Sequence, residues 1–290
     1  KLKKIYQTIR LLIWTMSNKK KFLILIPAYN ESKNITSVLK KIDTKKNDVL
    51  VIDDGSNDGT KQISKKFGAK VINNEKNMGV DYSLNKGFFY ALKKKYTHVI
   101  TIDADGQHDP GLIPKFIGLT DNYDVIIGSR FIEGGSTPDF SSYRLLLSRL
   151  GNFLVRYLGG AYLLRDCTSG YRVIKREILE KCQISKFPTT GYSFQSWLIC
   201  ELLRQGAVIK ESPIIFAKRE TGESKLSLAD QLEFFLSIIR IRFNNSEDFL
   251  KYCLVGLSGV IVNLGVYYYL TRFISFPIAL SSPVAIEISI

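Results

Sequence analysis

The chain has 290 residues, of which 45% are hydrophobic, and its 41 Lys and Arg against 27 Asp and Glu give a formal charge of +14. This length accommodates one large domain, or one domain with an appendage, and the basic excess suits nucleic acid, an anionic membrane face or phosphorylated substrates. Lysines on solvated helix faces account for much of that excess. Four well-separated cysteines without a CxxC pair exclude a disulfide framework, and two histidines are too few for a zinc site built on histidine ligands.

The first part of the chain predicts an α/β fold. Residues 1–20 form an N-terminal extension whose apolar run is too short for a signal peptide. Short runs rich in Ile and Val then alternate with helical stretches: Phe22–Ile26, Val49–Asp53, Ala69–Ile72, His98–Asp103 and Asp124–Gly128. This alternation predicts βαβ units around a largely parallel, Rossmann-like sheet flanked by helices. Ligands of such sheets gather beyond the carboxyl ends of the strands.

Two later segments predict basic amphipathic helices. Tyr143–Leu158 repeats apolar residues at helical spacing with arginines between them, and Leu226–Phe243 has a similar pattern. Such a helix lies at a membrane surface or packs on the sheet, and the pattern alone leaves both alternatives open. We assign the first helix to a domain of residues 21–225, and residues 226–248 to a juxtamembrane helix.

Residues 249–290 predict a membrane region. Tyr252–Thr271 contains no charged residue, and about 20 apolar residues suffice to cross the hydrocarbon core of a bilayer. A buried core helix is the alternative. A second apolar stretch runs from Phe273 to Glu287, so we expect transmembrane helices, with the second span cut off in a protein that is multi-pass at full length. Basic residues before the first span favour a cytoplasmic position for the large domain: Arg240, Arg242 and Lys251.

Polar residues follow the first two predicted strands. Pro27-Ala28-Tyr29-Asn30-Glu31 comes directly after the first strand, and Asp53-Asp54-Gly55-Ser56 ends the second. A carboxylate at such a strand end can accept hydrogen bonds from a nucleobase N–H or a ribose hydroxyl. For either cluster alone, an Asx turn followed by a helix cap is the alternative.

A third cluster predicts a metal site. Asp103 and Asp105 end an apolar strand, and Gln107 follows at the same spacing. In an extended segment, alternate residues point to the same side, so the three oxygen ligands would converge. That set suits Mg²⁺ or Mn²⁺, with water and phosphate completing the coordination. A solvated acidic loop is the alternative. His108 beside the cluster is predicted to be a surface residue, and contact with the substrate is the alternative for it.

The succession PAYNE, VIDDGSNDGT, NMG, TIDADGQHDP and GSRFIEGG resembles family 2 glycosyltransferases with the GT-A fold. Within that family, GSRFIEGG followed by CTSGYRV and RETGESKL is similar to the polyprenol-phosphate sugar synthases, which include dolichol-phosphate mannose synthase. The resemblance covers Lys21 to about Phe243. The tail FLKYCLVGLSGVIVNLGVYYYL resembles the start of a GtrA-like membrane domain.

The resemblance implies roles for residues at matching positions. The donor nucleotide sugar would contact Pro27, Tyr29, Glu31, Asp53, Asp54, Asp103, Ala104, Asp105, Arg219 and Lys225. The metal that bridges the donor diphosphate would be held by Asp103, Asp105 and Gln107. The acceptor phosphate would be held by Arg130, Arg144 and Ser148, and the catalytic residues would be Asp105 and Arg130. Because Arg144 and Ser148 are four positions apart, they share one helix face, which would adjoin the membrane.

Two positions depart from the family's pattern. Relatives commonly have a basic residue after NxG, where this chain has Val80 and Asp81, which weakens any assignment of donor contacts there. Relatives also often have an acidic residue in the segment that here contains Gln195 and Ser196. The residues that face the sugar are therefore left open.

The implied activity is transfer of a hexosyl group from a nucleotide-diphosphate sugar to a polyprenyl or dolichyl monophosphate at a lipid bilayer. Mannose from GDP-mannose is favoured, and a UDP-glucose donor is the alternative. A lipid phosphate is already ionised at pH 7, so no general base is needed, and we predict a single in-line displacement that inverts the anomeric centre. A non-catalytic scaffold or lipid-carrier transporter is the alternative from another class. We expect no nucleic-acid partner, while the membrane helices offer a surface for an oligomer.

Overall fold

The structure, a computed structural model, describes residues 20–182, 184, 193–217, 228–245 and 247–289. The chain separates into two compact units, Lys1–Ile239 and Arg240–Ile290. The division falls inside the predicted juxtamembrane helix of residues 226–248. The domain boundaries predicted from the sequence remain predictions.

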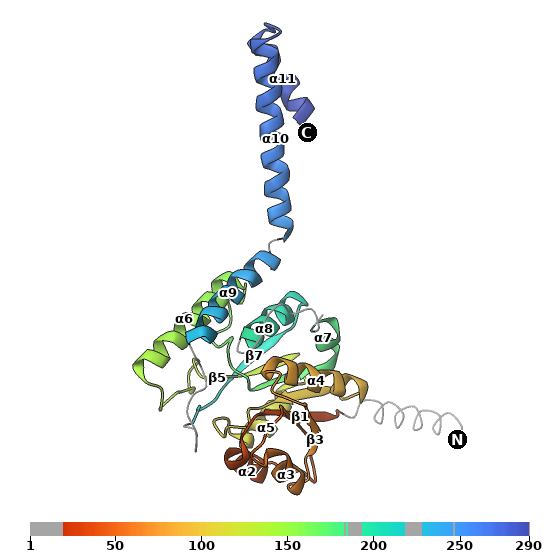
Figure 1. The fold of residues 1–290 in the computed structure, drawn as a ribbon, viewed down its shortest axis with the longest axis vertical. Coiled ribbons are helices and arrows are strands. Elements are labelled where there is room, and N and C mark those ends of the chain that lie inside the picture. Colours follow the sequence, from red (N-terminus) through yellow and green to blue (C-terminus); the bar gives the residue numbers. More distant parts are fainter. Residues whose placement is uncertain (1–19, 183, 185–192, 218–227, 246, 290) are drawn as a thin grey trace, which may run out of the picture. The chain divides into compact units, whose positions relative to one another are not determined.

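In the described part of the first unit, seven strands form one sheet (Figure 1). They are β1 Phe22–Ala28, β2 Asp48–Asp53, β3 Lys70–Asn73, β4 His98–Thr101, β5 Val125–Ser129, β6 Arg172–Lys175 and β7 Ile209–Pro213. Their order in the sheet is β3-β2-β1-β4-β6-β5-β7. Strand β6 is antiparallel to both of its neighbours, and the other pairs are parallel. The carboxyl ends of the six parallel strands and the amino end of β6 therefore lie along one edge.

The predicted α/β fold is confirmed, and the five predicted strand runs correspond to β1–β5. Strands β6 and β7 were not predicted. Their sequences, RVIK and IKESP, are short and contain charged residues, and they lack the apolar runs that marked the other strands. Their place in the sheet comes from pairing with β4 and β5, which are distant in the sequence.

Helices cover both faces of this sheet (Figure 1). The helices described up to residue 245 are α2 Ser32–Lys41, α3 Thr60–Lys66, α4 Val80–Lys93, α5 Ile113–Leu119, α6 Ser142–Leu158, α7 Arg176–Lys181, α8 Phe194–Arg204 and α9 Leu228–Asn245, with a short 3₁₀ turn η1 at Pro110–Leu112. The two predicted amphipathic helices correspond to α6 and α9. Helix α6 packs beside α9, since a Cβ atom added at Gly151 would lie 3.1 Å from the ring of Phe234.

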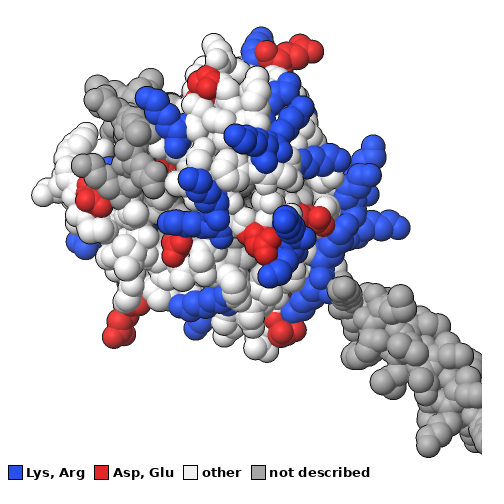
Figure 2. Space-filling model, turned by 90° about the horizontal axis from the view of Figure 1, so that it is seen from below, with Lys and Arg blue, Asp and Glu red and all other residues white. Residues whose placement is uncertain are grey.

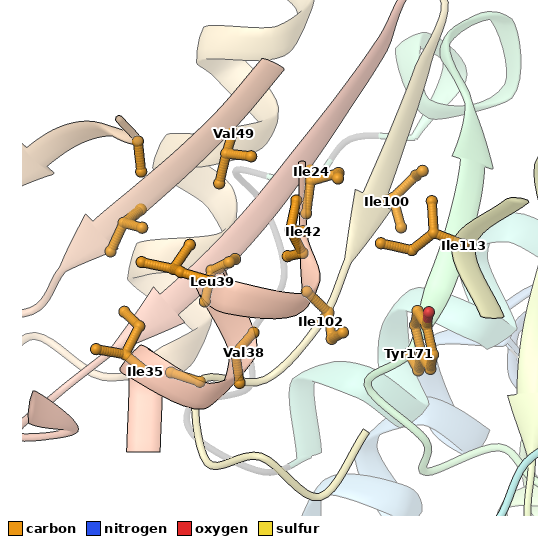
Figure 3. Close-up of a cluster of buried hydrophobic side chains, with 14 of the residues drawn as sticks. Ile24, Ile35, Val38, Leu39, Ile42, Val49, Ile100, Ile102, Ile113 and Tyr171 are labelled. Atoms are coloured by element: carbon orange, nitrogen blue, oxygen red, sulfur yellow. The ribbon is translucent and has the colours of Figure 1, made fainter. Parts of the chain in front are cut away.

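The core of the first unit follows the alternation of side chains along the strands. Ile24 and Ile26 of β1 lie in a cluster with Ile35 and Leu39 of α2 and with Ile113 of α5 (Figure 3). The intervening residues point to the opposite face, where α4 packs. There a Cβ atom added at Gly87 would lie 2.2 Å from the Cδ1 atom of Leu25, so only glycine allows this close approach.

Lysines gather at the ends of the first helices. Lys40 and Lys41 lie in the last turn of α2, and Lys65 and Lys66 lie in the last turn of α3, where positive charge complements the helix dipole. Figure 2 views the molecule from the side on which α2 and α3 lie in Figure 1, and basic side chains dominate the charged residues of this face. Part of the basic excess is thus explained by solvated helix ends.

The second unit contains two helices, α10 Glu247–Arg272 and α11 Ile278–Ser289. Within the described residues, Cys253–Arg272 is the one segment long and apolar enough to cross a membrane, judged by its length and composition. None of it is buried inside the structure, and Leu254 and Ile261 are 67% and 64% exposed. Helix α11 has only 12 residues, so a second span remains a prediction.

Candidate active site

The predicted site residues between positions 27 and 130 lie along the edge of the sheet where the strands β1, β2, β4 and β5 end. Pro27 closes β1 together with Ala28, Asp53 is the last residue of β2, and Arg130 directly follows β5. Because β6 runs in the opposite direction, its first residue, Arg172, pairs with Thr101 at the end of β4. The loop before β6 therefore joins the same edge.

The loops after β1 and β2 hold each other. The backbone N–H of Asn30 donates to the Ser56 hydroxyl at 2.9 Å, and the backbone N–H of Asn57 donates to the Asn30 amide oxygen at 3.0 Å. The backbone N–H of Glu31 donates to the Thr60 hydroxyl at 2.9 Å. These contacts fix the two loops that the sequence assigns to the donor, and Tyr29 and Glu31, both half-buried, lie in the first of them.

The two neighbouring carboxylates of the second motif have different environments. Asp54 accepts the backbone N–H groups of Met78 and Gly79, at 3.0 and 2.8 Å, and the side-chain amide of Asn74 at 2.6 Å. Asp53 is fully buried, and its Oδ1 atom accepts the backbone N–H of Ser56 at 3.2 Å. Its Oδ2 atom is buried and has no hydrogen-bond partner among the described residues. Asp53 thus has an unused acceptor atom that a ligand could engage, whereas Asp54 fastens the NMG loop, residues 77–79.

Glycine at position 55 makes this fastening possible. Its φ is +76°, and a Cβ atom there would lie 2.6 Å from the carbonyl carbon of Lys76. Any side chain at this position would separate the turn after β2 from the NMG loop. The attachment of the NMG loop, residues 77–79, to the turn after β2 therefore depends on two adjacent residues, Asp54 and Gly55.

The predicted metal ligands follow β4. Asp105 is 6% exposed and accepts the backbone N–H of Gln107 at 3.0 Å, and the Gln107 amide donates to the Ala217 carbonyl at 2.8 Å. The Asp103 side chain is 38% exposed. A Cβ atom at Gly170 would lie 3.2 and 3.3 Å from the two Asp103 carboxylate oxygens, so glycine leaves room for that carboxylate.

The donor set fits a divalent cation that takes further ligands from its substrate. Among the described residues, no three His, Cys, Asp or Glu side chains are grouped so that they could hold a metal ion by themselves. Two carboxylates and an amide oxygen suit a hard cation whose remaining ligands are phosphate and water oxygens. The predicted ligand set of Asp103, Asp105 and Gln107 remains a prediction.

His108 is not on the surface, and that prediction was wrong. It is 1% exposed and lies against the rings of Tyr171 and Phe216, with centroids 5.2 and 5.1 Å away. Its Nδ1 atom accepts the backbone N–H of Asp103 at 3.4 Å and lies 3.5 Å from the Asp103 carboxylate. The polar loop around it suggested exposure, but the aromatic residues that cover the ring come from distant segments of the chain.

Arg130 is held by a buried carboxylate that sequence reasoning missed. Its Nε and Nη2 atoms donate to the two oxygens of Asp166 at 2.7 and 2.8 Å, and its backbone N–H donates to Asp166 at 3.0 Å. Burial by itself would lower the pKa of Arg130, but the Asp166 carboxylate offsets this and raises it. Burial would raise the pKa of Asp166, and the Arg130 guanidinium holds it below its usual range. Both groups are therefore charged near neutral pH.

Asp166 could have been noticed because it directly precedes the CTSGYRV motif. Nothing in the local sequence, however, pairs it with Arg130, which lies 36 positions earlier. The carboxylate of Glu211 in β7 in turn accepts the backbone N–H groups of Arg165 and Asp166, both at 2.9 Å. The loop before β6 is thus fixed from the side of β7 as well.

Helix α6 carries the other predicted acceptor residues. Arg144 is exposed, and its guanidinium lies over the Phe140 ring, 4.1 Å from the centroid. Ser148 is half-buried, one turn further along, and its carbonyl accepts the side-chain amide of Asn152 at 2.9 Å. Arg130 and Ser148 are connected through Asn152 and Thr168 by hydrogen bonds. The remaining predicted donor residues, Arg219 and Lys225, lie outside the described residues.

One face of helix α6 packs against the rest of the first unit, and the opposite face exposes the large apolar residues of the helix. Gly151, Asn152 and Val155 are buried. The opposite face, with the turn that follows it, forms an apolar strip of seven exposed residues: Tyr143, Leu146, Leu150, Phe153, Tyr157, Tyr162 and Leu163. Rings of successive residues along the strip are in contact, with centroids 4.5 Å apart for Phe153 and Tyr157 and 6.0 Å apart for Tyr157 and Tyr162. An ordinary surface helix would direct such a strip toward the core.

Comparison with known proteins identifies the family. The family model described as "Glycosyl transferase family 2" matches residues 23–183, which include β2 through β6 and all of β1 except Phe22. The chain belongs to glycosyl transferase family 2. Because this is a family of enzymes, the match argues against the alternative of a non-catalytic scaffold or lipid-carrier transporter.

Among curated relatives, the chain is similar to proteins that bear three related names. It is 32% identical to "Polyprenol monophosphomannose synthase" of Mycolicibacterium smegmatis, over 73% of this chain and 83% of that protein. It is 30% identical to "Dolichol-phosphate mannosyltransferase" of Pyrococcus furiosus, over 93% of this chain and 78% of that protein. It is 32% identical to "Undecaprenyl-phosphate mannosyltransferase" of Micrococcus luteus, over 71% and 87% respectively.

A solved structure supports the fold. Glucosyl-3-phosphoglycerate synthase from Mycobacterium tuberculosis, determined in complex with Mn²⁺, UDP and glucosyl-3-phosphoglycerate, superposes with a TM-score of 0.60. The match covers 77% of this chain and 80% of that protein at 19% sequence identity. At this identity the likeness establishes the GT-A-like fold alone.

Proposed function

We propose that the chain transfers a hexosyl group, with mannose favoured, from a nucleotide-diphosphate sugar to a polyprenyl or dolichyl monophosphate. The observation that carries the proposal is its similarity, at 30–32% identity, to three relatives whose names all describe mannosyl transfer to a polyprenol or dolichol phosphate. The sheet edge described above supports the same chemistry, because carboxylates follow β2 and β4 and a fixed arginine follows β5 along that edge.

The donor would lie over the ends of β1, β2 and β4. The unpartnered Oδ2 atom of Asp53 offers a buried acceptor for an N–H or O–H group of the nucleoside. Asp103, Asp105 and Gln107 would hold Mg²⁺ or Mn²⁺, which would neutralise charge on the donor diphosphate. Arg219 and Lys225 would supply further positive charge to the departing nucleotide, and GDP-mannose is the favoured donor.

The acceptor would be positioned by Arg130. Its guanidinium plane is fixed by the two parallel hydrogen bonds to Asp166, so its orientation is set before any phosphate binds. Arg144 and Ser148 on α6 would complete the phosphate site. A phosphate oxygen is ionised at pH 7 and attacks without losing a proton, so these residues need only place it in line with the anomeric carbon. The expected product has inverted configuration.

The apolar strip of α6 supports a position at a bilayer surface. From Ser141 to Arg165 the sequence contains four arginines and no Asp or Glu, a charge pattern that complements anionic lipid. Leu163 is 95% exposed at the end of the strip, and burial of such side chains in lipid is favourable. With the segment Cys253–Arg272 crossing the bilayer, we propose a membrane protein whose catalytic unit is cytoplasmic and whose membrane region is GtrA-like and multi-pass.

The test is product formation with a panel of donors. The purified full chain is incubated with polyprenyl phosphate and GDP-mannose, UDP-glucose or other nucleotide sugars, with Mg²⁺, with Mn²⁺ or with EDTA. A mannosylated lipid formed from GDP-mannose and lost in EDTA is expected, and Asp105→Ala should lose most of this activity. A glucosylated lipid from UDP-glucose would replace the favoured donor, and no sugar-lipid product with any donor would overturn the proposal.

A further inference from the structure

The Thr168 hydroxyl lies where the two parts of the predicted acceptor site meet. It accepts a hydrogen bond from Arg130 Nη2 at 2.7 Å and one from the Asn152 amide at 3.3 Å, and it donates to Asp166 Oδ1 at 3.3 Å. A threonine hydroxyl has one donor and two acceptor positions. All three are used here, so the orientation of this hydroxyl is fully determined.

Asn152 connects this point to helix α6. It is 3% exposed, and its amide nitrogen also donates to the Ser148 carbonyl at 2.9 Å. Its amide oxygen accepts the backbone N–H of Cys167 at 2.6 Å. The turn of α6 that contains Ser148 is therefore fastened to the loop before β6, and Thr168 is the residue of that loop that also contacts Arg130.

We propose that Thr168 is a positioning residue for the acceptor phosphate. Its hydroxyl sets the distance between the Arg130 guanidinium and the Ser148 turn of α6, so that both can contact one phosphate group. Removing the hydroxyl would leave hydrogens of Arg130 Nη2 and of the Asn152 amide without their acceptor, while Asp166 would still hold Arg130. The inference rests on the proposed acceptor, and it assigns a role to a residue that no sequence motif singled out as a ligand.

The matched variants are Thr168→Val, which keeps the shape and removes the hydroxyl, and Thr168→Ser, which keeps the hydroxyl. We expect Thr168→Val to raise the KM for polyprenyl phosphate about tenfold, the loss typical of one hydrogen bond to a charged group. The KM for the nucleotide sugar should stay within about twofold, and Thr168→Ser should behave like the wild type within the same margin. Thermal unfolding of all three proteins verifies that they are equally folded.

Binding of decyl phosphate, measured by titration calorimetry, provides a readout that does not depend on sugar transfer. The same order of affinity is expected, with wild type and Thr168→Ser alike and Thr168→Val about tenfold weaker. An unchanged acceptor KM in Thr168→Val, an equal rise in the KM for both substrates, or a Thr168→Ser protein as impaired as Thr168→Val would each overturn the inference. If the wild type transfers no sugar to polyprenyl phosphate, the proposed function fails, and the calorimetric comparison still decides whether Thr168 positions a phosphate.

Discussion

Replacing Asp54 by asparagine tests how the donor pocket is built. The Oδ1 atom of Asp54 accepts hydrogen bonds from Met78 N–H and the Asn74 amide, and Oδ2 accepts one from Gly79 N–H. An asparagine that keeps its oxygen at the Oδ1 position would direct an NH₂ group at the Gly79 N–H. One charge-assisted bond would be lost and two donors would face each other in a site where the carboxylate is 4% exposed.

The expected cost follows from those contacts. A hydrogen bond to a charged group is worth about 1.5–3 kcal/mol, and the other two bonds would become weaker neutral ones. We therefore expect Asp54→Asn to lower the free energy of unfolding by about 3 kcal/mol, or to release the NMG loop at a similar cost. In either case the KM for the nucleotide sugar should rise, because the turn that follows Asp53 is no longer held to the NMG loop.

Asp53→Asn is the matched control one position earlier. Its Oδ1 atom accepts one backbone N–H, which an amide oxygen can also do, and its Oδ2 atom has no partner among the described residues. This variant should unfold within about 1 kcal/mol of the wild type and still bind the donor more weakly. Denaturant unfolding in detergent and donor KM measurements on both variants separate the two roles. An Asp54→Asn protein with wild-type stability and wild-type donor KM would refute the reasoning.

Three further outcomes are expected. Arg144→Ala should raise the KM for polyprenyl phosphate roughly tenfold without changing donor binding, because Arg144 is assigned to the phosphate, and unchanged acceptor kinetics would remove that assignment. Leu163→Glu should slow transfer to polyprenyl phosphate in anionic vesicles but leave transfer to a soluble short-chain acceptor unchanged. The control Val208→Glu, at a residue that is 54% exposed elsewhere on the surface, should change neither rate. If Leu163→Glu changes the rates of both assays equally, the lipid contact is contradicted. Burial, with help from Lys20 and Lys175, lowers the pKa of folded His98 to about 4. A histidine in an unfolded chain has a pKa of about 6.5. The contribution of His98 to the free energy of unfolding should therefore be full above that pH and fall by up to about 3 kcal/mol as the pH drops to 4. His98→Gln should remove this pH dependence in thermal unfolding, and an unchanged pH dependence in that variant would refute the assignment.

The strand ends were predictable because the pattern there is local. Apolar runs marked β1, β2 and β4, and the polar residues that follow them had to meet at one edge once the strands were parallel. The exposure of the α6 strip was not predictable from its periodicity, since the same spacing is found in helices that pack on a sheet. The structure decided between these alternatives because Gly151 and Asn152 face the protein and the larger apolar residues do not.

The hydrogen-bonded partners of the site residues were the part that the sequence did not provide. Asp53 and Asp54 are adjacent and chemically identical, and only the fold reveals that three donors from residues 74–79 converge on the second of them. The pair of Arg130 and Asp166 depends on β6 running between β4 and β5, and β6 itself was not predicted. His108 was misplaced for the same reason, since Tyr171 and Phe216 reach it across the sheet edge.

The configuration and identity of the sugar-lipid product decide whether the chain transfers mannose to a lipid phosphate with inversion. The purified chain would be supplied with GDP-mannose, polyprenyl phosphate and Mg²⁺ or Mn²⁺, and the lipid product would be analysed by mass spectrometry and by NMR of the anomeric centre. We predict a polyprenyl monophosphate that carries one mannosyl residue with the configuration opposite to that of the donor. A product with retained configuration, or a sugar attached to a hydroxyl instead of the lipid phosphate, would contradict it.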